Sequence, residues 1–81
     1  MTHDEIRALI IRELKRIAPE AELDAVDPAV ELRDQVDLDS MDILNWMIAI
    51  HDATGVEIPE ADYARMATLD DCVAYLAQRI K

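Results

Sequence analysis

Apolar positions near the start of the chain recur at steps of three and four, which predicts an amphipathic helix over roughly residues 2–17. The members of this stripe are Ile6, Leu9, Ile10, Leu14 and Ile17. Thr2, followed three residues later by Glu5, predicts a capping box at the helix start. The helix should end near Pro19, with Lys15 and Arg16 in its last turn, where basic side chains suit the negative end of the helix dipole.

Residues 19–39 show no sustained hydrophobic period and contain Pro19 and Pro28. The apolar residues of this segment are scattered and are expected to act as anchors: Leu23, Val26, Val30, Leu32 and Val36. A loop of this length without regular structure is unusual in a small domain, and such loops are often functional or pinned across a bundle. We therefore expect an irregular, acidic connection.

A second helix is predicted to open at the sequence Asp39-Ser40-Met41-Asp42 and to run to about Thr54. It should stop at Gly55, the only glycine, because a helix commonly ends on a residue in the left-handed conformation. The following Val56-Glu57-Ile58-Pro59 should be extended, since the residue before proline avoids helical angles.

The remainder of the chain predicts a short helix over Glu60–Arg65 and a last helix that begins with Thr68, capped reciprocally by Asp71. The apolar face of this last helix consists of Leu69, Cys72, Val73, Leu76 and Ile80. The fold class expected is all-α: a small bundle of three long helices plus one short helix, with a long loop between the first two, in a single domain over residues 1–81.

The second helix has two faces that both contain apolar residues, taking 100° per residue. One face should point into the bundle: Ile43, Trp46, Met47 and Ile50. The opposite face holds Met41, Asn45, Ile48 and Asp52, with His51 near its edge. Exposed Met41 and Ile48 are expected of a helix that docks onto a partner protein, although single surface apolar residues are also normal.

Composition limits the function classes. A chain of 81 residues buries only about 60% of its unfolded surface, which leaves little room for an enclosed catalytic pocket. No nucleophile and base pair stands out, so we expect no catalytic residues and no enzyme. His3 and His51 lack further ligands at metal spacing, and the segment from Asp37 to Asp42 lacks the glycine of a calcium loop, so no metal site is expected. Cys72 lies on an apolar face and should be a small buried hydrophobe.

The charge is strongly acidic, with a net value of −10. From Glu20 to Asp62 there are thirteen acidic residues and a single base, Arg33. This balance opposes binding to nucleic acid and to anionic lipid and favours basic protein partners. The N-terminus lacks a signal-peptide pattern and no apolar run is long enough for membrane insertion, so we expect a soluble, cytoplasmic monomer.

Ser40 is the candidate site because it stands at the start of the second helix, directly after Asp39. A helix start exposes free backbone N–H groups and the positive end of the dipole, and both favour a phosphate ester on a nearby hydroxyl. The alternative interpretation is that Asp39 or Ser40 simply caps the helix.

Three segments together, Asp39-Ser40-Met41-Asp42, Thr54-Gly55-Val56-Glu57-Ile58-Pro59 and Ala67-Thr68-Leu69-Asp70-Asp71, closely resemble the acyl carrier protein family over essentially the whole chain. The resemblance implies that Ser40 carries 4′-phosphopantetheine through a phosphodiester, and that the thiol of this group holds acyl cargo as a thioester. A separate transferase with Mg²⁺ would attach it, and Asp39 would either help to hold that metal or serve only as the helix cap.

The resemblance also implies partners: a phosphopantetheinyl transferase, an acyl-loading ligase, and acyl-processing or acyltransferase enzymes with basic patches. The residues expected to contact them are Met41, Asp42, Asn45, Ile48, His51 and Asp52. The chain departs from the family pattern where a glycine before the serine is replaced by Asp37 or Leu38, and where Asn45 and His51 dilute the acidic second helix. These departures favour a specialised carrier over a housekeeping role in fatty acid synthesis. An aminoacyl or peptidyl carrier and an unmodified helical adaptor remain as alternatives, with the acidity favouring an acyl carrier.

Overall fold

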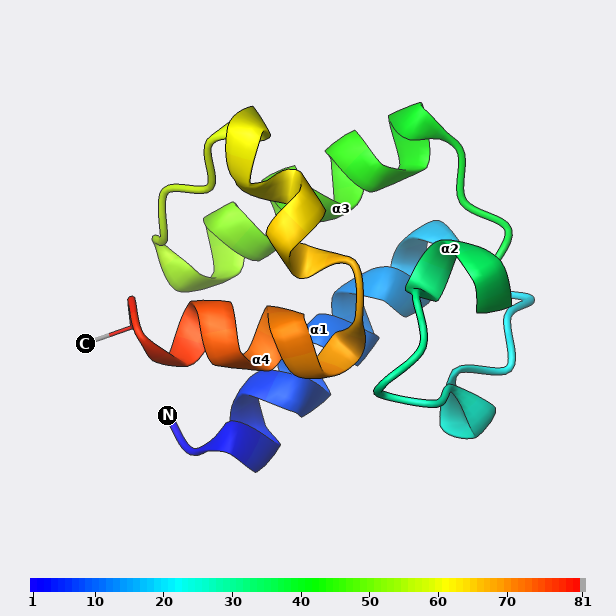
Figure 1. Ribbon diagram of the computed structural model, residues 1–81, viewed down its shortest axis with the longest axis horizontal. Coiled ribbons are helices and arrows are strands. Elements are labelled where there is room, and N and C mark those ends of the chain that lie inside the picture. The colour runs from blue at the N-terminus through cyan, green and yellow to red at the C-terminus, as the bar shows by residue number, and fades with distance from the viewer. Residues whose placement is uncertain (81) are drawn as a thin grey trace.

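The computed structural model describes residues 1–80 and is built from helices and their connecting loops (Figure 1). In chain order these are α1 (His3–Ile17), the 3₁₀-helix η1 (Leu23–Ala25), α2 (Leu32–Gln35), α3 (Ser40–Thr54), the 3₁₀-helix η2 (Glu60–Met66) and α4 (Leu69–Ala77). The only β-type pairing within residues 1–80 is an isolated bridge between Glu31 and Thr68. The expected all-α class is confirmed.

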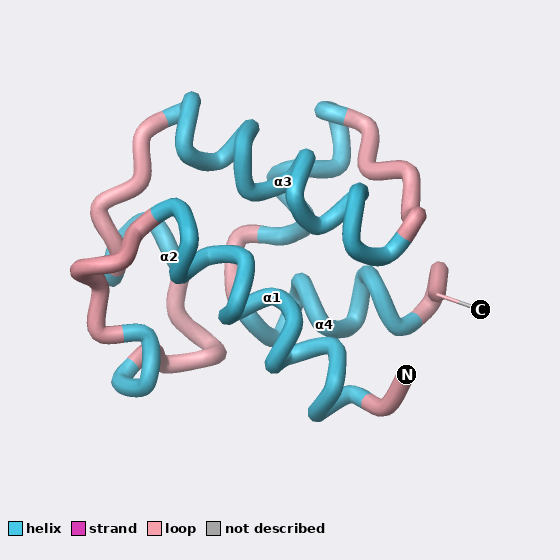
Figure 2. The backbone as a smooth tube through the Cα atoms, turned by 180° about the vertical axis from the view of Figure 1, so that it is seen from behind, coloured by secondary structure: helices cyan, strands magenta, loops and turns pink. Residues whose placement is uncertain are grey.

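Three helices form the framework, with α1 in contact with both α3 and α4. Figure 1 shows α3 above α1 and α4 in the view, with η2 passing in front of α3 and descending towards α4, which it contacts. Figure 2, from behind, shows α1 passing in front of α4 below α3, with the start of α1 and the end of α4 on the same side of the molecule. No helix among residues 1–80 is both long and apolar enough to cross a membrane.

One hydrophobic core joins these helices. The predicted inner face of α3 is confirmed, because Trp46, Met47 and Ile50 are buried and Ile43 is half-buried against them. From α1 and α4 the core takes Ile6, Ile10, Leu14, Leu69, Cys72, Val73, Tyr75 and Leu76. Ile80, expected on the face of the last helix, lies beyond its end at Ala77 and is half-buried.

The helix ends follow the predicted local signals. The Thr2 hydroxyl accepts the Glu5 N–H at 3.1 Å, and the Glu5 carboxylate accepts the Thr2 N–H at 2.8 Å. Gly55 ends α3 with a φ of 75°, in the left-handed region. At α4, the Thr68 hydroxyl accepts the Asp71 N–H at 3.0 Å. The reverse bond from Thr68 N–H to Asp71 is not made, so only half of the predicted reciprocal cap forms.

The connection over residues 19–39 corrects the sequence-based expectation, because it contains η1 and α2 rather than only irregular structure. Each of these helices is three or four residues long, too short for a hydrophobic period to appear. The segment is pinned to the start of α4, where Ala67 O accepts the Leu32 N–H at 2.8 Å and Pro28 O accepts the Asp70 N–H at 3.0 Å. The segment is therefore pinned to the bundle, which is one of the two roles considered for a long connection.

Three of the five expected anchors in this connection are buried: Leu23, Leu32 and Val36. Val26 is half-buried against the core. Val30 is 40% exposed, so its assignment as an anchor was wrong. It follows Pro28 in a turn whose polar groups are satisfied by Gln35, which donates to Val30 O at 3.0 Å.

Candidate functional site

Ser40 is the first residue of α3, and its side chain is exposed. Asp39 precedes it as the N-cap, with extended backbone angles (φ −88°, ψ 180°). The Asp39 carboxylate accepts the Asp42 N–H at 2.8 Å, and the Asp42 carboxylate accepts the Asp39 N–H at 3.3 Å. This capping box is made by the two neighbouring aspartates. The Ser40 hydroxyl therefore does not cap the helix and is left available to solvent.

A groove of about 600 Å³ begins beside Ser40 and is mainly apolar. Its α3 wall is formed by Ser40, Met41, Ile43, Leu44, Trp46 and Met47. A second wall comes from η2 and the residue after it, through Glu60, Tyr63, Ala64, Met66 and Ala67. The segment before α3 completes the lining with Glu31, Leu32, Arg33 and Leu38. An exposed hydroxyl at the rim of such a groove can carry a group whose apolar part lies inside it.

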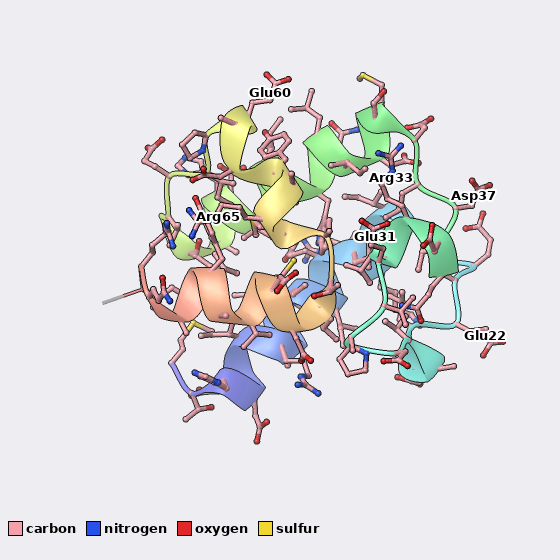
Figure 3. All side chains as sticks on the ribbon, viewed as in Figure 1. Glu22, Glu31, Arg33, Asp37, Glu60 and Arg65 are labelled. Carbon is pink, nitrogen blue, oxygen red and sulfur yellow. The ribbon has the colours of Figure 1, made fainter. Side chains whose placement is uncertain are left out.

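The surroundings of Ser40 are electrostatically negative. Within residues 1–80 all ion pairs take their basic partner from α1, namely Arg7, Arg12 and Arg16. None of the acidic residues between positions 20 and 62 has an ion-pair partner in that part of the chain. Figure 3 shows Asp37 at the edge of this region and Glu60 at the top of η2, with Arg33 between α2 and the start of α3. A surface of uncompensated carboxylates attracts basic partners, and salt weakens that attraction.

The predicted outer face of α3 is confirmed for four of its residues. Met41 is 61% exposed and Ile48 is 49% exposed, and Asn45 and Asp52 are also exposed. Asp52 lies twelve positions after Ser40 on the same helix, so it is about 18 Å along the axis from the candidate site. The face is therefore a long strip rather than a cluster around Ser40.

Two of the expected contact residues, Asp42 and His51, are only half exposed. Asp42 is held in the capping box. His51 Nδ1 lies 2.8 Å from the carbonyl oxygen of Val56, and because a carbonyl only accepts, this nitrogen carries the proton. His51 thus fastens the end of α3 to the following loop.

Sequence reasoning missed the groove wall opposite α3. Tyr63, Ala64 and Met66 lie more than twenty positions after Ser40, and no local pattern connects them to it. It also missed Leu44, which is 39% exposed and lines the groove. The available signal was an apolar residue beside the predicted inner face of α3, between Ile43 and Asn45.

Two further expectations concern metal and thiol chemistry. Residues 1–80 contain no group of three or more His, Cys, Asp or Glu side chains placed to hold a metal ion. Cys72 is fully buried, its Sγ lies 3.1 Å from the carbonyl oxygen of Met66, and burial followed by the charge of Asp71 raises its pKa to about 12. A thiol in this setting is inert, so Cys72 cannot be a cargo-carrying group.

Comparison with known proteins identifies the family of this chain and the prosthetic group of that family. The family model named "Phosphopantetheine attachment site" matches residues 4–76. The chain belongs to the acyl carrier protein family. Members are carriers rather than catalysts, and their prosthetic group is phosphopantetheine. The family works with phosphopantetheinyl transferases and acyl-processing enzymes in general.

Individual relatives support the same assignment. The acyl carrier protein of Campylobacter jejuni strain 81-176 is 25% identical over 75 residues, which cover 93% of this chain and 91% of the relative. The meromycolate extension acyl carrier protein of Mycolicibacterium aurum is 35% identical over 69 residues, which cover 85% of this chain and 67% of the relative. A solved structure of acyl carrier protein from Enterococcus faecalis matches the fold with a TM-score of 0.74 at 23% identity, over 98% of this chain and 99% of that one.

The two roles considered for Asp39, helix cap and metal ligand, can be separated by substitution. Asp39→Ala removes the side-chain acceptor of the Asp42 N–H and should lower the free energy of unfolding by about 1 kcal/mol. Asp39→Asn keeps an oxygen acceptor and should stay within a few tenths of a kcal/mol of wild type. Urea unfolding followed by circular dichroism measures both. Equal destabilisation by the two substitutions would contradict the capping role, and slow prosthetic-group attachment to a stable Asp39→Asn protein would indicate the metal role.

Proposed function

We propose that this chain is an acyl carrier protein in which Ser40 carries 4′-phosphopantetheine. One observation supports the residue assignment most strongly: the Ser40 hydroxyl is exposed at the first position of α3 while the neighbouring aspartates cap the helix. When bound, the prosthetic group supplies a thiol that holds acyl cargo as a thioester.

The residues present fit such a group. The phosphate end would meet the free backbone N–H groups and the positive dipole at the start of α3. The apolar groove beside Ser40 offers shelter to an acyl chain, with Met41 and Leu44 at its edge and Trp46 and Met47 deeper. The groove is lined by residues of α2, α3 and η2, so it exists only in the folded protein.

Attachment needs little chemistry from this chain. The Ser40 oxygen would form a bond to the phosphorus on the pantetheine side of coenzyme A while the pyrophosphate bridge breaks. Adenosine 3′,5′-bisphosphate would leave, the serine proton would pass to a base of the transferase, and the transferase with Mg²⁺ would supply the catalysis. The chain's own contribution is to present the hydroxyl on a rigid turn. Asp39, which uses one carboxylate oxygen for the cap, would have the other oxygen free for the metal.

The chain is proposed to be a specialised carrier in acyl metabolism. It would act as a single domain in the cytoplasm. The support is the 35% identity to a meromycolate extension carrier, together with the replacement of a glycine before Ser40 by Asp37 or Leu38. A loading ligase and acyltransferases would dock on the exposed strip of Met41, Asn45, Ile48 and Asp52. Basic patches on these enzymes would give fast and salt-sensitive encounters.

The test is to incubate the purified chain with coenzyme A, Mg²⁺ and a phosphopantetheinyl transferase of broad specificity and to record its intact mass. Wild type should gain one prosthetic-group increment, and Ser40→Ala should gain none. Thr2→Ala is the matched control, because it removes another exposed hydroxyl at a helix start and should still be loaded. Loading of Ser40→Ala would overturn the residue assignment. No loading of any variant would favour the unmodified adaptor.

A further inference from the structure

The groove wall formed by η2 is fastened to α4 by side-chain contacts. The Tyr75 hydroxyl donates to the Asp62 carboxylate at 2.6 Å. The Arg65 guanidinium carbon lies 5.4 Å from the centre of the Tyr75 ring. At the end of η2, the Cys72 thiol donates to the carbonyl oxygen of Met66 at 3.1 Å. These contacts are spread along η2 from its first turn to its last residue.

Tyr75 is the centre of this attachment. It is only 4% exposed, although its hydroxyl reaches the half-buried Asp62. Arg79 covers the ring at 3.6 Å from its centre and also donates to the Tyr75 carbonyl oxygen at 3.0 Å. Burial, and then the hydrogen bond to Asp62, raise the pKa of Tyr75. The hydroxyl therefore keeps its proton, and can donate it to Asp62, throughout the neutral range. Figure 3 shows Arg65 on the η2 side of α4.

No comparable attachment joins η2 to α3. Among the hydrogen bonds and ion pairs of residues 1–80, none connects a side chain of η2 with α3, and the groove lies between these two elements. Met66 and Tyr63 of η2 pack on the same apolar core as Trp46 and Met47 of α3, so the directional side-chain contacts that hold η2 come from α4.

The η2 helix has little stability of its own. It is a 3₁₀-helix of seven residues without a side-chain N-cap, whereas 3₁₀ runs beyond three or four residues are uncommon because their hydrogen-bond geometry is poor. A segment of this kind keeps its place through tertiary contacts. Loosening one of them should let it move away from α3 without unfolding the three long helices.

We propose that Tyr75, through its hydrogen bond to Asp62, sets the separation between η2 and α3. This separation determines the space in the groove and thereby the length of acyl chain that the carrier shelters. Tyr75 and Asp62 are positioning residues, because neither lines the groove. They hold the helix that carries Tyr63, Ala64 and Met66 into it. This inference rests on the proposed function and adds to it the element that selects cargo by size.

The experiment uses a series of acyl-coenzyme A substrates of increasing chain length, transferred to the protein in one step by the phosphopantetheinyl transferase. Trp46, the only tryptophan, lines the groove, so its fluorescence reports how the groove is filled. For wild type, the change in emission and in melting temperature on loading should reach a maximum at one chain length. Tyr75→Phe keeps the ring and its stacked arginines but loses the hydroxyl, and its maximum should move to longer chains.

Two variants of the acceptor provide the controls. Asp62→Ala removes the acceptor and should shift the maximum as Tyr75→Phe does, and the double variant should shift no further because both changes break one bond. Asp62→Asn keeps an acceptor oxygen for the Tyr75 hydroxyl, so its chain-length profile should match that of wild type. If Tyr75→Phe fails to fold, Asp62→Ala gives the same test from a half-buried position.

The outcomes are distinguishable by intact mass. If wild type and the Tyr75 and Asp62 variants load and show identical chain-length profiles, the inference is overturned and the carrier function stands. The same holds if the wild-type profile has no maximum. A failure of all proteins to load contradicts the proposed function and this inference with it.

Discussion

Trp46→Ala is expected to destabilise the protein by about 3–5 kcal/mol, since truncating a buried aromatic side chain removes its transfer free energy and leaves a cavity. Trp46 is 2% exposed and its indole N–H donates to the carbonyl oxygen of Ile10 at 3.3 Å, which ties α3 to α1. A folded chain of 81 residues has a total stability of about 4–12 kcal/mol, so the loss is a large share of it. The melting temperature, followed by circular dichroism, should fall by at least about 12 °C.

Ile48→Ala is the matched control for this prediction. Ile48 lies on the same helix but is 49% exposed, so its truncation should change stability by less than about 1 kcal/mol. A Trp46→Ala protein that melts within about 4 °C of wild type would show that the contact between α1 and α3 is not a main source of stability.

Stability should fall steeply in alkaline solution because of Cys72. Its pKa is raised from 9.0 to about 12 by burial and then by the charge of Asp71, so the folded protein holds a proton that the unfolded chain releases. This contribution is fully present below about pH 9 and is lost as the pH rises towards 12. Between these pH values the free energy of unfolding falls by up to about 1.4 kcal/mol for each pH unit. Urea midpoints measured between pH 8 and 10.5 would reveal the slope.

Cys72→Ala isolates the thiol. At pH 8 the variant should be less stable than wild type, since it loses the sulfur contacts and the hydrogen bond to Met66 O. Between pH 9 and 10.5 it should lose less stability than wild type, so the two curves converge. A residual slope of the same sign is expected from Tyr75, whose pKa is also raised by burial. Parallel curves for the two proteins would rule out the thiol as the source.

The local signals of the sequence predicted helix positions well. Thr2 with Glu5 predicted the start of α1, the segment Asp39-Ser40-Met41-Asp42 the start of α3, and Gly55 the end of α3, because capping bonds and a left-handed terminus depend on residues within one turn. The same signals placed Ser40 at a helix start. The inner face of α3 also followed from sequence, since the spacing of Trp46, Met47 and Ile50 is a property of the helix alone.

The short helices η1 and α2 and the exposure of Val30 had no local signal in the sequence. The helices η1 and α2 form because Leu23 and Leu32 are buried and because the backbone at Leu32 pairs with Ala67, a residue far away in the chain. The exposure of the Val30 side chain also depends on distant residues, because its environment is set by the turn that packs on α4. An apolar residue in a segment without a period cannot be assigned to the core from sequence.

By itself, the sequence determined the helical class, the ends of the two longest helices, the acidic surface and the serine that begins α3, since all of these depend on neighbouring residues and on composition. Only the tertiary structure decided that Ser40 opens onto a groove, and that Tyr75 holds its far wall through Asp62. Both depend on elements that are distant in the chain and meet only when the core packs. Such contacts follow from the relative placement of helices, which no periodic pattern encodes.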